Sequence, residues 1–471
     1  FLAGDTIHRD LIDIHPGYGN LLNILAFFVF GEDLLSLRYP LVVLTLLQGA
    51  AALWLLRPQG NMAAFIGAFA VTAFSFIQFL NPSANWHALA AFFALALCLT
   101  KRQAGSASRL LLAGFIVGIA FFTRQLSGVF LAIGLIAVLL SECRDDRSAS
   151  RVPALILGGV PLLGLAAYVM SKGHLAGLPV ALFMAMVGAF GDWLHDILFS
   201  ALVINNQDFI SARSYSDILV LALANLFRTG IVGAISGTAW TALLLIFPVV
   251  GILAVVRLRD GLSLSPKVML AAVWACSALH YQIPVYLMMA VAPAILALIS
   301  LSNRPAVLAG VAALSAWAVL FQAARPIDRS LASIVASEAY EPYVASDLPR
   351  VSLRIGEDSR AEYAQIIEAI ERGSGADEAL MTVQMNPEIN FMTARRSPVP
   401  YYGTQLGLKT AADVEAAIAA LDKAAPLFVV HKPNDKYLTP QGAELLKAVQ
   451  ARSPAPQRLG SFELYRYPAP E

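Results

Sequence analysis

Charged residues and cysteines are both scarce in this chain of 471 residues. Only 14% of the residues are charged, and there are three cysteines, Cys98, Cys143 and Cys276. Soluble globular domains have about 25% charged residues, so the composition excludes a purely soluble enzyme. Three cysteines also exclude a disulfide framework or a Cys-rich zinc site. The net charge of +1 gives no concentrated basic surface, so no nucleic acid partner is expected.

Apolar residues are abundant, at 58% of the chain with a mean hydropathy of +0.66. This predicts a polytopic α-helical membrane protein. Apolar runs of about 15–20 residues, bounded by charge or by Pro, Gly or Asn, are candidate spans. They lie at 37–56, 62–80, 86–100, 109–123, 125–141, 153–170, 239–256, 267–281, 284–300 and 306–323. The pair that meets at Thr123-Arg124 also fits a single re-entrant unit.

Charge is unevenly spread along the chain. Residues 325–471 hold 16 of the 33 basic and 19 of the 32 acidic residues. This predicts a multi-span membrane domain at 37–325 and a soluble α/β domain at 326–471. Residues 1–36 are expected to form an extracytoplasmic loop with interfacial helices. Apolar residues in 171–238 are interrupted by charge, which favours amphipathic helices lying at the membrane interface.

The short loops give the orientation, because cytoplasmic loops carry an excess of Lys and Arg. Five loops (57–61, 101–109, 141–152, 257–267 and 301–305) hold 11 of the 17 basic residues before position 325. We therefore expect these loops to be cytoplasmic. The N-terminal segment, 171–238 and the C-terminal domain would then be extracytoplasmic, together with acids such as Glu32 and Asp33.

Strands and helices alternate in the C-terminal domain, which is an α/β pattern. Helices are predicted at 359–372, with Ile366, Ile367 and Ile370 on one face, at 410–424 with Thr410 as N-cap, and at 440–451. Strands are predicted at 379–385, 427–431 and 462–467. The domain shows no phosphate-binding loop and no clear nucleophile–base pair, so it is expected to cover or order a membrane site.

The segment from Gly4 to Tyr18 contains Arg9-Asp10, Asp13 and Pro16, followed by Phe30-Gly31 and Leu37-Arg38. It resembles the first extracytoplasmic loop of GT-C fold glycosyltransferases related to family 39, the protein mannosyltransferase and lipid A aminoarabinose transferase type. In this chain His8 stands where that family has Tyr, and Gly17 where it has a second Pro.

Three later segments resemble the same family. They are Gly114 to Arg124, His280-Tyr281 followed by Ala292-Pro293, and Phe391 to Pro398, which is similar to a "Tyr-x-x-Thr-Gly-Arg" turn. The family's acidic catalytic motif follows its first span. The chain begins at Phe1 without Met, so we expect both that span and that motif to precede Phe1.

The resemblance implies an inverting glycosyltransferase of a bacterial inner membrane. It would move a sugar from a polyprenyl-phosphate donor to a hydroxyl of a lipid, glycan or protein acceptor. Asp10 and Asp13 are the candidate catalytic carboxylates, since the acceptor oxygen needs a base. They also fit a solvated loop. Asp5, His8, Asp10 and His15 have the ligand types of a divalent-cation site, but their spacing is not distinctive.

Arg124 is the candidate ligand of the donor phosphate, because it lies between two apolar runs and Arg suits phosphate. His280 and Tyr281, at an outer helix end, are candidates for the same role. His15 and His87 are candidates for the substrate cavity. Arg124 and Tyr281 also fit interfacial anchors. A transporter or lipid-linked sugar flippase is the alternative function, although the chain shows no internal repeat typical of transporters.

Overall fold

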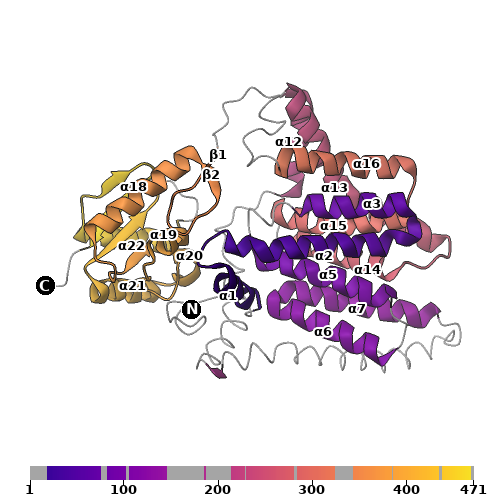
Figure 1. Ribbon diagram of the computed structural model, residues 1–471, viewed down its shortest axis with the longest axis horizontal. Helices are drawn as coiled ribbons and strands as arrows, with labels where there is room; N and C mark the ends of the chain where they lie inside the picture. The colour runs from indigo at the N-terminus through magenta and orange to yellow at the C-terminus, as the bar shows by residue number, and fades with distance from the viewer. Residues whose placement is uncertain are drawn as a thin grey trace.

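A computed structural model of the chain describes residues 18–75, 82–101, 106–145, 185–186, 214–228, 230–280, 284–323, 343–384, 386–433 and 438–467. Two parts lie side by side (Figure 1). One is a helical bundle, and the other is a smaller part with helices and strands from the C-terminal third of the chain. Helix α1 (Tyr18–Phe30) lies between them.

Helices of the bundle form on the predicted apolar runs. Their bounds are α2 Tyr39–Leu56, α3 Asn61–Phe74, α5 Ala84–Lys101, α6 Ala107–Thr123, α7 Gln125–Asp145, α13 Gly230–Arg259, α14 Pro266–His280, α15 Pro284–Leu301 and α16 Pro305–Trp317. A short π-helical turn, η5 (Ala318–Ala323), follows α16. The run predicted at 153–170 lies outside the described residues.

Three helical stretches are long and apolar enough to cross a membrane: Ser36–Gln59, Gln125–Glu142 and Gly233–Arg259. The other apolar helices of the described part contain apolar stretches of 10–17 residues. A span needs about 20 apolar residues when it stands upright in a bilayer. The number of about ten spans therefore stays a prediction.

Helix α13 corrects one predicted boundary. The span was expected to begin at 239, but α13 begins at Gly230, directly after α12 (Tyr215–Arg228). Thr238 and Thr241 do not interrupt the helix, because each hydroxyl donates a hydrogen bond to the carbonyl four residues earlier. Gly237 lets α12 pack closely, since a Cβ there would lie 2.4 Å from the carbonyl oxygen of Ala222.

The surfaces of the two parts differ. Large hydrophobic side chains are exposed on many bundle helices, for example Leu46, Phe65, Phe115 and Ile252. Among the described residues, every exposed large hydrophobic side chain lies between Leu22 and Leu320, and none lies in 343–467. An apolar exterior of this extent fits lipid better than water. The exterior of the bundle is therefore suited to a membrane.

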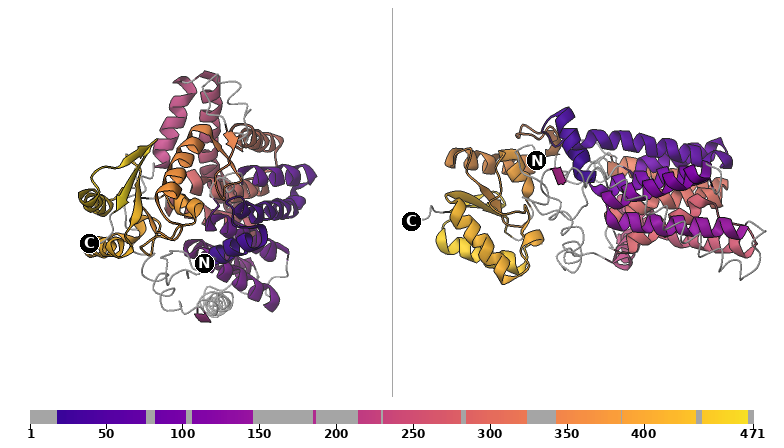
Figure 2. Two further views of the ribbon diagram at one scale, coloured as in Figure 1. Left: turned by 60° about the vertical axis from the view of Figure 1, so that its left-hand side comes forward. Right: turned by 90° about the horizontal axis from the view of Figure 1, so that it is seen from below.

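The two ends of the bundle can be told apart by contacts between helix termini. The Lys267 ammonium, at the start of α14, donates to the Leu55 carbonyl near the end of α2. Asn303, after α15, donates to the Gln59 carbonyl at the same end. The start of α2 and the end of α14 therefore lie at the opposite end of the bundle, which faces the C-terminal part (Figure 2).

The C-terminal part is built on a four-stranded sheet in the order β3-β4-β6-β5. Strand β3 (Leu380–Thr382) is parallel to β4 (Leu427–His431), and β6 (Phe462–Tyr467) is antiparallel to both β4 and β5 (Gln457–Leu459). A separate hairpin pairs β1 (Tyr343–Ala345) with β2 (Arg354–Gly356). Strands β1, β2 and β5, which have three residues each, were not predicted.

Strand β4 is buried on both faces, which explains its continuous apolar sequence. Leu427 and Val429 pack in one core with Leu421 of α21 (Ala411–Ala424) and Leu445 of α22 (Pro440–Arg452). Phe428 and Val430 pack in the other core, against the buried isoleucines of α18 (Glu357–Gly373). The predicted helices and strands agree with these elements, and Thr410 is the N-cap of α21 in a capping box with Asp413.

Helix α19 (Pro387–Thr393) ends at Ala394, which has a φ of +55°. This left-handed conformation strains any residue with a Cβ. We expect Ala394→Gly to raise the free energy of unfolding by about 0.5–1 kcal/mol. Ala416→Gly, at an exposed site inside α21, is the matched control and should lower it by about 1 kcal/mol. Thermal unfolding of both variants measures the difference, and destabilisation by Ala394→Gly would contradict the expectation.

Candidate functional site

Arg124 occupies the turn between two antiparallel helices. Helix α6 ends at Thr123 and α7 begins at Gln125, with Arg124 in an extended conformation between them. The turn is tight, because a Cβ on Gly128 would lie 2.4 Å from the Cα of Phe121. The close approach of α6 and α7 keeps the Arg124 side chain among neighbouring helices, where it is only 8% exposed.

The Arg124 guanidinium is held by a hydroxyl and an aromatic ring. Nη1 donates to the Ser127 Oγ at 3.0 Å, and Cζ lies 4.7 Å from the ring centroid of Tyr286, in the first turn of α15. Within the described part of the chain, Arg124 forms no ion pair. A guanidinium has five N–H donors, so this one keeps donors for an anionic ligand.

The ends of α12, α14 and α15 meet beside this arginine. The Tyr215 hydroxyl, at the start of α12, donates to the Ala278 carbonyl at 2.7 Å, near the end of α14. Tyr286 follows a short connection from α14 to α15 and contacts Arg124. Arg124 therefore lies beside the start of α15.

An apolar cavity of about 320 Å³ lies between α12, α13, α14 and α15. Its lining includes Leu244 and Phe247 from α13, Cys276 from α14 and Leu287 from α15. Tyr215 lines it too, and Leu287 directly follows Tyr286. The cavity can accept an apolar chain. Arg124 is not among its lining residues, but Tyr215 and Leu287 belong to the helix ends that lie near Arg124.

The structure describes the other predicted site residues only in part. His87, in the first turn of α5, is half-buried and its Nδ1 lacks a hydrogen-bond partner among the described residues. It lies at the same end of the bundle as Arg124. His280 is the last residue of α14. Asp10, Asp13, His15 and Tyr281 lie outside the described residues, so their roles stay predictions.

The candidate metal ligands also lie outside the described residues: Asp5, His8, Asp10 and His15. Among the residues that the structure does describe, no three His, Cys, Asp or Glu side chains are grouped to hold a metal ion. A divalent cation at the N-terminal loop therefore stays a prediction.

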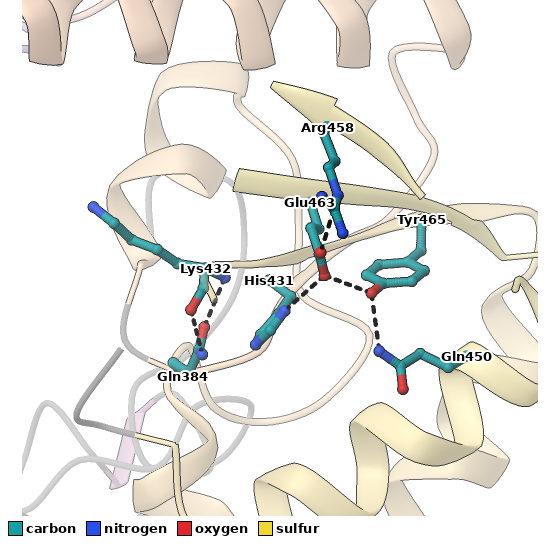
Figure 3. Close-up of polar contacts among 7 residues, drawn as sticks. All are labelled: Gln384, His431, Lys432, Gln450, Arg458, Glu463 and Tyr465. Carbon is teal, nitrogen blue, oxygen red and sulfur yellow. Dashed lines mark hydrogen bonds and ion pairs between the residues drawn. The ribbon is translucent and has the colours of Figure 1, made fainter. Parts of the chain in front are cut away.

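A second polar cluster lies on the C-terminal sheet (Figure 3). Glu463 accepts a hydrogen bond from Tyr465 at 2.7 Å and lies 3.2 Å from the Nδ1 of His431, the residue it pairs with across β4 and β6. Partial burial raises the pKa of Glu463, whereas the hydrogen bonds from Tyr465 and His431 lower it. The lowering is the larger effect, so the pKa of Glu463 lies below its ordinary value. The carboxylate stays ionised and favours the tautomer with hydrogen on Nδ1.

This cluster resembles the base half of a catalytic dyad. The Nε2 of His431 is buried and has no partner among the described residues. On the other side of the strand end, Gln384 holds the main chain of Lys432 by two hydrogen bonds (Figure 3). No Ser, Thr or Cys side chain is hydrogen-bonded to His431 or Glu463 in the described part of the chain. The cluster therefore fits a polar network that orders the sheet.

Ser127, Tyr215 and Tyr286 were not among the site residues predicted from the sequence. Tyr286 lies five residues after Tyr281 in an apolar segment, and such a tyrosine is common at a helix end. Only its contact with Arg124, from a distant part of the chain, gives it a place in the site. Glu32 and Asp33 were grouped with the outer acids, but their pairing with the C-terminal part, which was predicted to lie on the same side, was not foreseen.

No family model and no curated protein matches the chain. One solved structure that is similar to it is described as ArnT from Cupriavidus metallidurans bound to undecaprenyl phosphate. The likeness covers 96% of this chain and 87% of that chain, with 11% sequence identity and a TM-score of 0.39. Similarity at this level does not assign a family or an activity.

Proposed function

We propose that the chain is an integral membrane glycosyltransferase of the GT-C, family 39 type. It moves a sugar from a polyprenyl-phosphate donor to an acceptor hydroxyl on the extracytoplasmic face. The observation that carries the proposal is Arg124, a buried guanidinium without an ion-pair partner in the described part of the chain. Its neighbour Tyr286 directly precedes Leu287, which lines an apolar cavity. A cation next to an apolar cavity suits a ligand with a phosphate head and a hydrocarbon tail.

The proposed reaction is a single displacement. The acceptor oxygen bonds to the anomeric carbon while the bond from that carbon to the phosphate oxygen breaks. The acceptor proton passes to a carboxylate, for which Asp10 and Asp13 are the candidates in this chain. Arg124 stabilises the charge that develops on the departing lipid phosphate, with His280 and Tyr281 as further candidate ligands. His15 and His87 are proposed to line the acceptor side.

The proposed orientation is supported by a revised count of basic residues. Arg109 and Lys267, both in predicted cytoplasmic loops, are buried in the bundle. Without them, nine of the eleven cations in the predicted cytoplasmic loops remain. On the other side, five of six remain without the buried Arg124. Lys and Arg are still in excess in the predicted cytoplasmic loops, so we propose that the C-terminal domain (326–471) and the N-terminal loop (1–36) lie outside a bacterial inner membrane.

The direct test is sugar transfer by the full-length chain in lipid nanodiscs. We expect labelled sugar to pass from a polyprenyl-phosphate donor to an acceptor hydroxyl, releasing free polyprenyl phosphate. In closed vesicles, movement of the intact lipid-linked sugar across the bilayer without covalent transfer would instead support a flippase. That result would overturn the glycosyltransferase proposal.

Lipid binding in the cavity can be measured through Cys276, which is exposed and lines it. In a variant with Cys98→Ala and Cys143→Ser, a polyprenyl phosphate at about ten times its Kd should slow alkylation of Cys276 by N-ethylmaleimide about tenfold. The matched polyprenyl alcohol has the same tail without the phosphate, so it should protect less. Equal alkylation with and without the phosphate lipid would exclude this cavity as the tail site.

A further inference from the structure

The C-terminal part is joined to the N-terminal segment through two short turns. Between α1 and η1 (Ser36–Arg38), the Asp33 carboxylate accepts hydrogen bonds from the backbone N–H of Ser352, at 3.1 and 3.0 Å, and from its Oγ at 2.8 Å. The backbone N–H of Leu35 donates to the same carboxylate at 2.7 Å. Hydrogen bonds to an ionised carboxylate are stronger than neutral ones, so Asp33 is the centre of this contact.

Main-chain and apolar contacts extend the junction on either side of Asp33. The Leu34 N–H donates to the Arg350 carbonyl at 2.9 Å, and the Leu34 side chain packs on the core that contains Leu348 and Val351. Apolar packing and a backbone hydrogen bond fix the register of the two turns. We call this set of contacts between residues 32–34 and 348–352 the latch.

Arg350 adds a third layer to the latch. Its guanidinium lies 3.3 Å from the Glu32 carboxylate and 5.6 Å from the ring centroid of Phe391. The ring of Phe391 also stacks on that of Phe27 of α1, with 5.7 Å between the ring centroids. Arg350 also has a φ of +60°. A strained residue of this kind persists only where the surrounding structure holds it.

The latch acts at the end of the bundle that contains Arg124. Helix α2 begins shortly after Asp33, and the start of α2 lies at the end opposite to the Leu55–Lys267 contact. The C-terminal part therefore faces the end at which α6 and α7 turn, as Figures 1 and 2 show. Two parts of a chain that meet in a small, polar interface commonly move relative to each other, so the position of the C-terminal part depends on the contacts of the latch.

We propose that Asp33 and Ser352 are positioning residues for the acceptor. They hold the C-terminal part over the Arg124 end of the bundle, where it completes the acceptor site. The effect of the latch on the acceptor rests on the proposed function, whereas the contacts that make up the latch do not. Donor binding, which uses Arg124 and the apolar cavity, does not depend on it.

Hydrogen exchange of the full chain in nanodiscs tests the latch without any transfer assay. In Asp33→Asn, the amides of Leu34 and Ser352 should exchange about tenfold faster, while those of β4 stay unchanged. Asp347→Asn is the matched control, because Asp347 is an exposed carboxylate of the same part that pairs with Arg360 at 2.9 Å. It should leave both amides protected. Unchanged exchange at Leu34 and Ser352 in Asp33→Asn would overturn the latch.

Kinetics then separate positioning from mere structural support. Asp33→Asn should raise the KM for the acceptor about tenfold with kcat within a factor of two, and Asp33→Glu should recover part of the loss. If the amides of Leu34 and Ser352 exchange faster in Asp33→Asn while the KM for the acceptor stays at the wild-type value, the latch is only a structural contact. That result would overturn the positioning role. Failure of the wild-type chain to transfer sugar would refute the proposed function and with it this role, while the exchange data would still decide whether the latch exists.

Discussion

Replacing Arg124 by alanine is expected to lower sugar transfer by about 100-fold or more. In the proposed site, the guanidinium binds the lipid phosphate while the tail enters the apolar cavity, so its loss would leave that phosphate without this charged partner. Arg124→Lys should fall between wild type and alanine, because an ammonium keeps the charge but loses the two parallel N–H donors. Transfer of labelled sugar and binding of polyprenyl phosphate measure the two effects.

Arg57→Ala is the matched control for this prediction. Arg57 is also an arginine over an aromatic ring, 5.6 Å from the centroid of Trp54, but it is exposed at the opposite end of the bundle. Its removal should leave donor binding within a factor of two of wild type. Wild-type donor binding in Arg124→Ala would remove the phosphate role from Arg124.

Arg109→Ala is expected to destabilise the bundle by about 3–5 kcal/mol. Arg109 is 1% exposed, and it donates to the Glu142 carboxylate at 2.8 Å and to the Leu99 carbonyl at 3.0 Å. It thereby joins α5, α6 and α7 at the predicted cytoplasmic end. Its removal leaves a half-buried carboxylate without its charged partner. Thermal unfolding in detergent should show a large fall in Tm.

Two further variants identify the cause of that fall. Arg109→Met combined with Glu142→Met removes both charges and should recover most of the lost stability, because apolar groups can replace a buried pair. Arg372→Ala removes an exposed pair with Glu368 and should change stability by about 0.5 kcal/mol or less. If Arg109→Ala were as mild as Arg372→Ala, the buried pair would have no structural role.

The sequence predicted most of the described helices and the strands β3, β4 and β6, because their signals are local. Strands β4 and β6 begin and end at the predicted residues, and α21 begins after its predicted N-cap, Thr410. The three isoleucines of α18 are buried as their spacing predicted. The spacing of apolar residues and the identity of a capping residue depend only on residues close together in the sequence. They therefore predict a helix or strand without knowledge of distant contacts.

Local signals were misleading where a polar side chain finds its partner elsewhere in the fold. Arg109 and Lys267 were interpreted as loop cations, yet both lie inside the bundle, bonded to other helices. Glu32 and Asp33 were grouped with the outer acids, and no local signal predicted that they contact a turn of the C-terminal part more than 300 residues away in sequence. The type of a residue shows which charge its side chain carries, but the burial and the partners of that side chain depend on how the helices pack.

By itself the sequence determined that this chain has an apolar, helical part and a more charged C-terminal part, and it singled out Arg124 as a candidate ligand of phosphate. Tertiary structure alone decided what surrounds that arginine. Ser127 is a local neighbour, but Tyr286 and the cavity come from helices that are far along the chain. The physical reason is that apolar patterning fixes which face of a helix is buried, whereas the choice of neighbours depends on how all helices pack together.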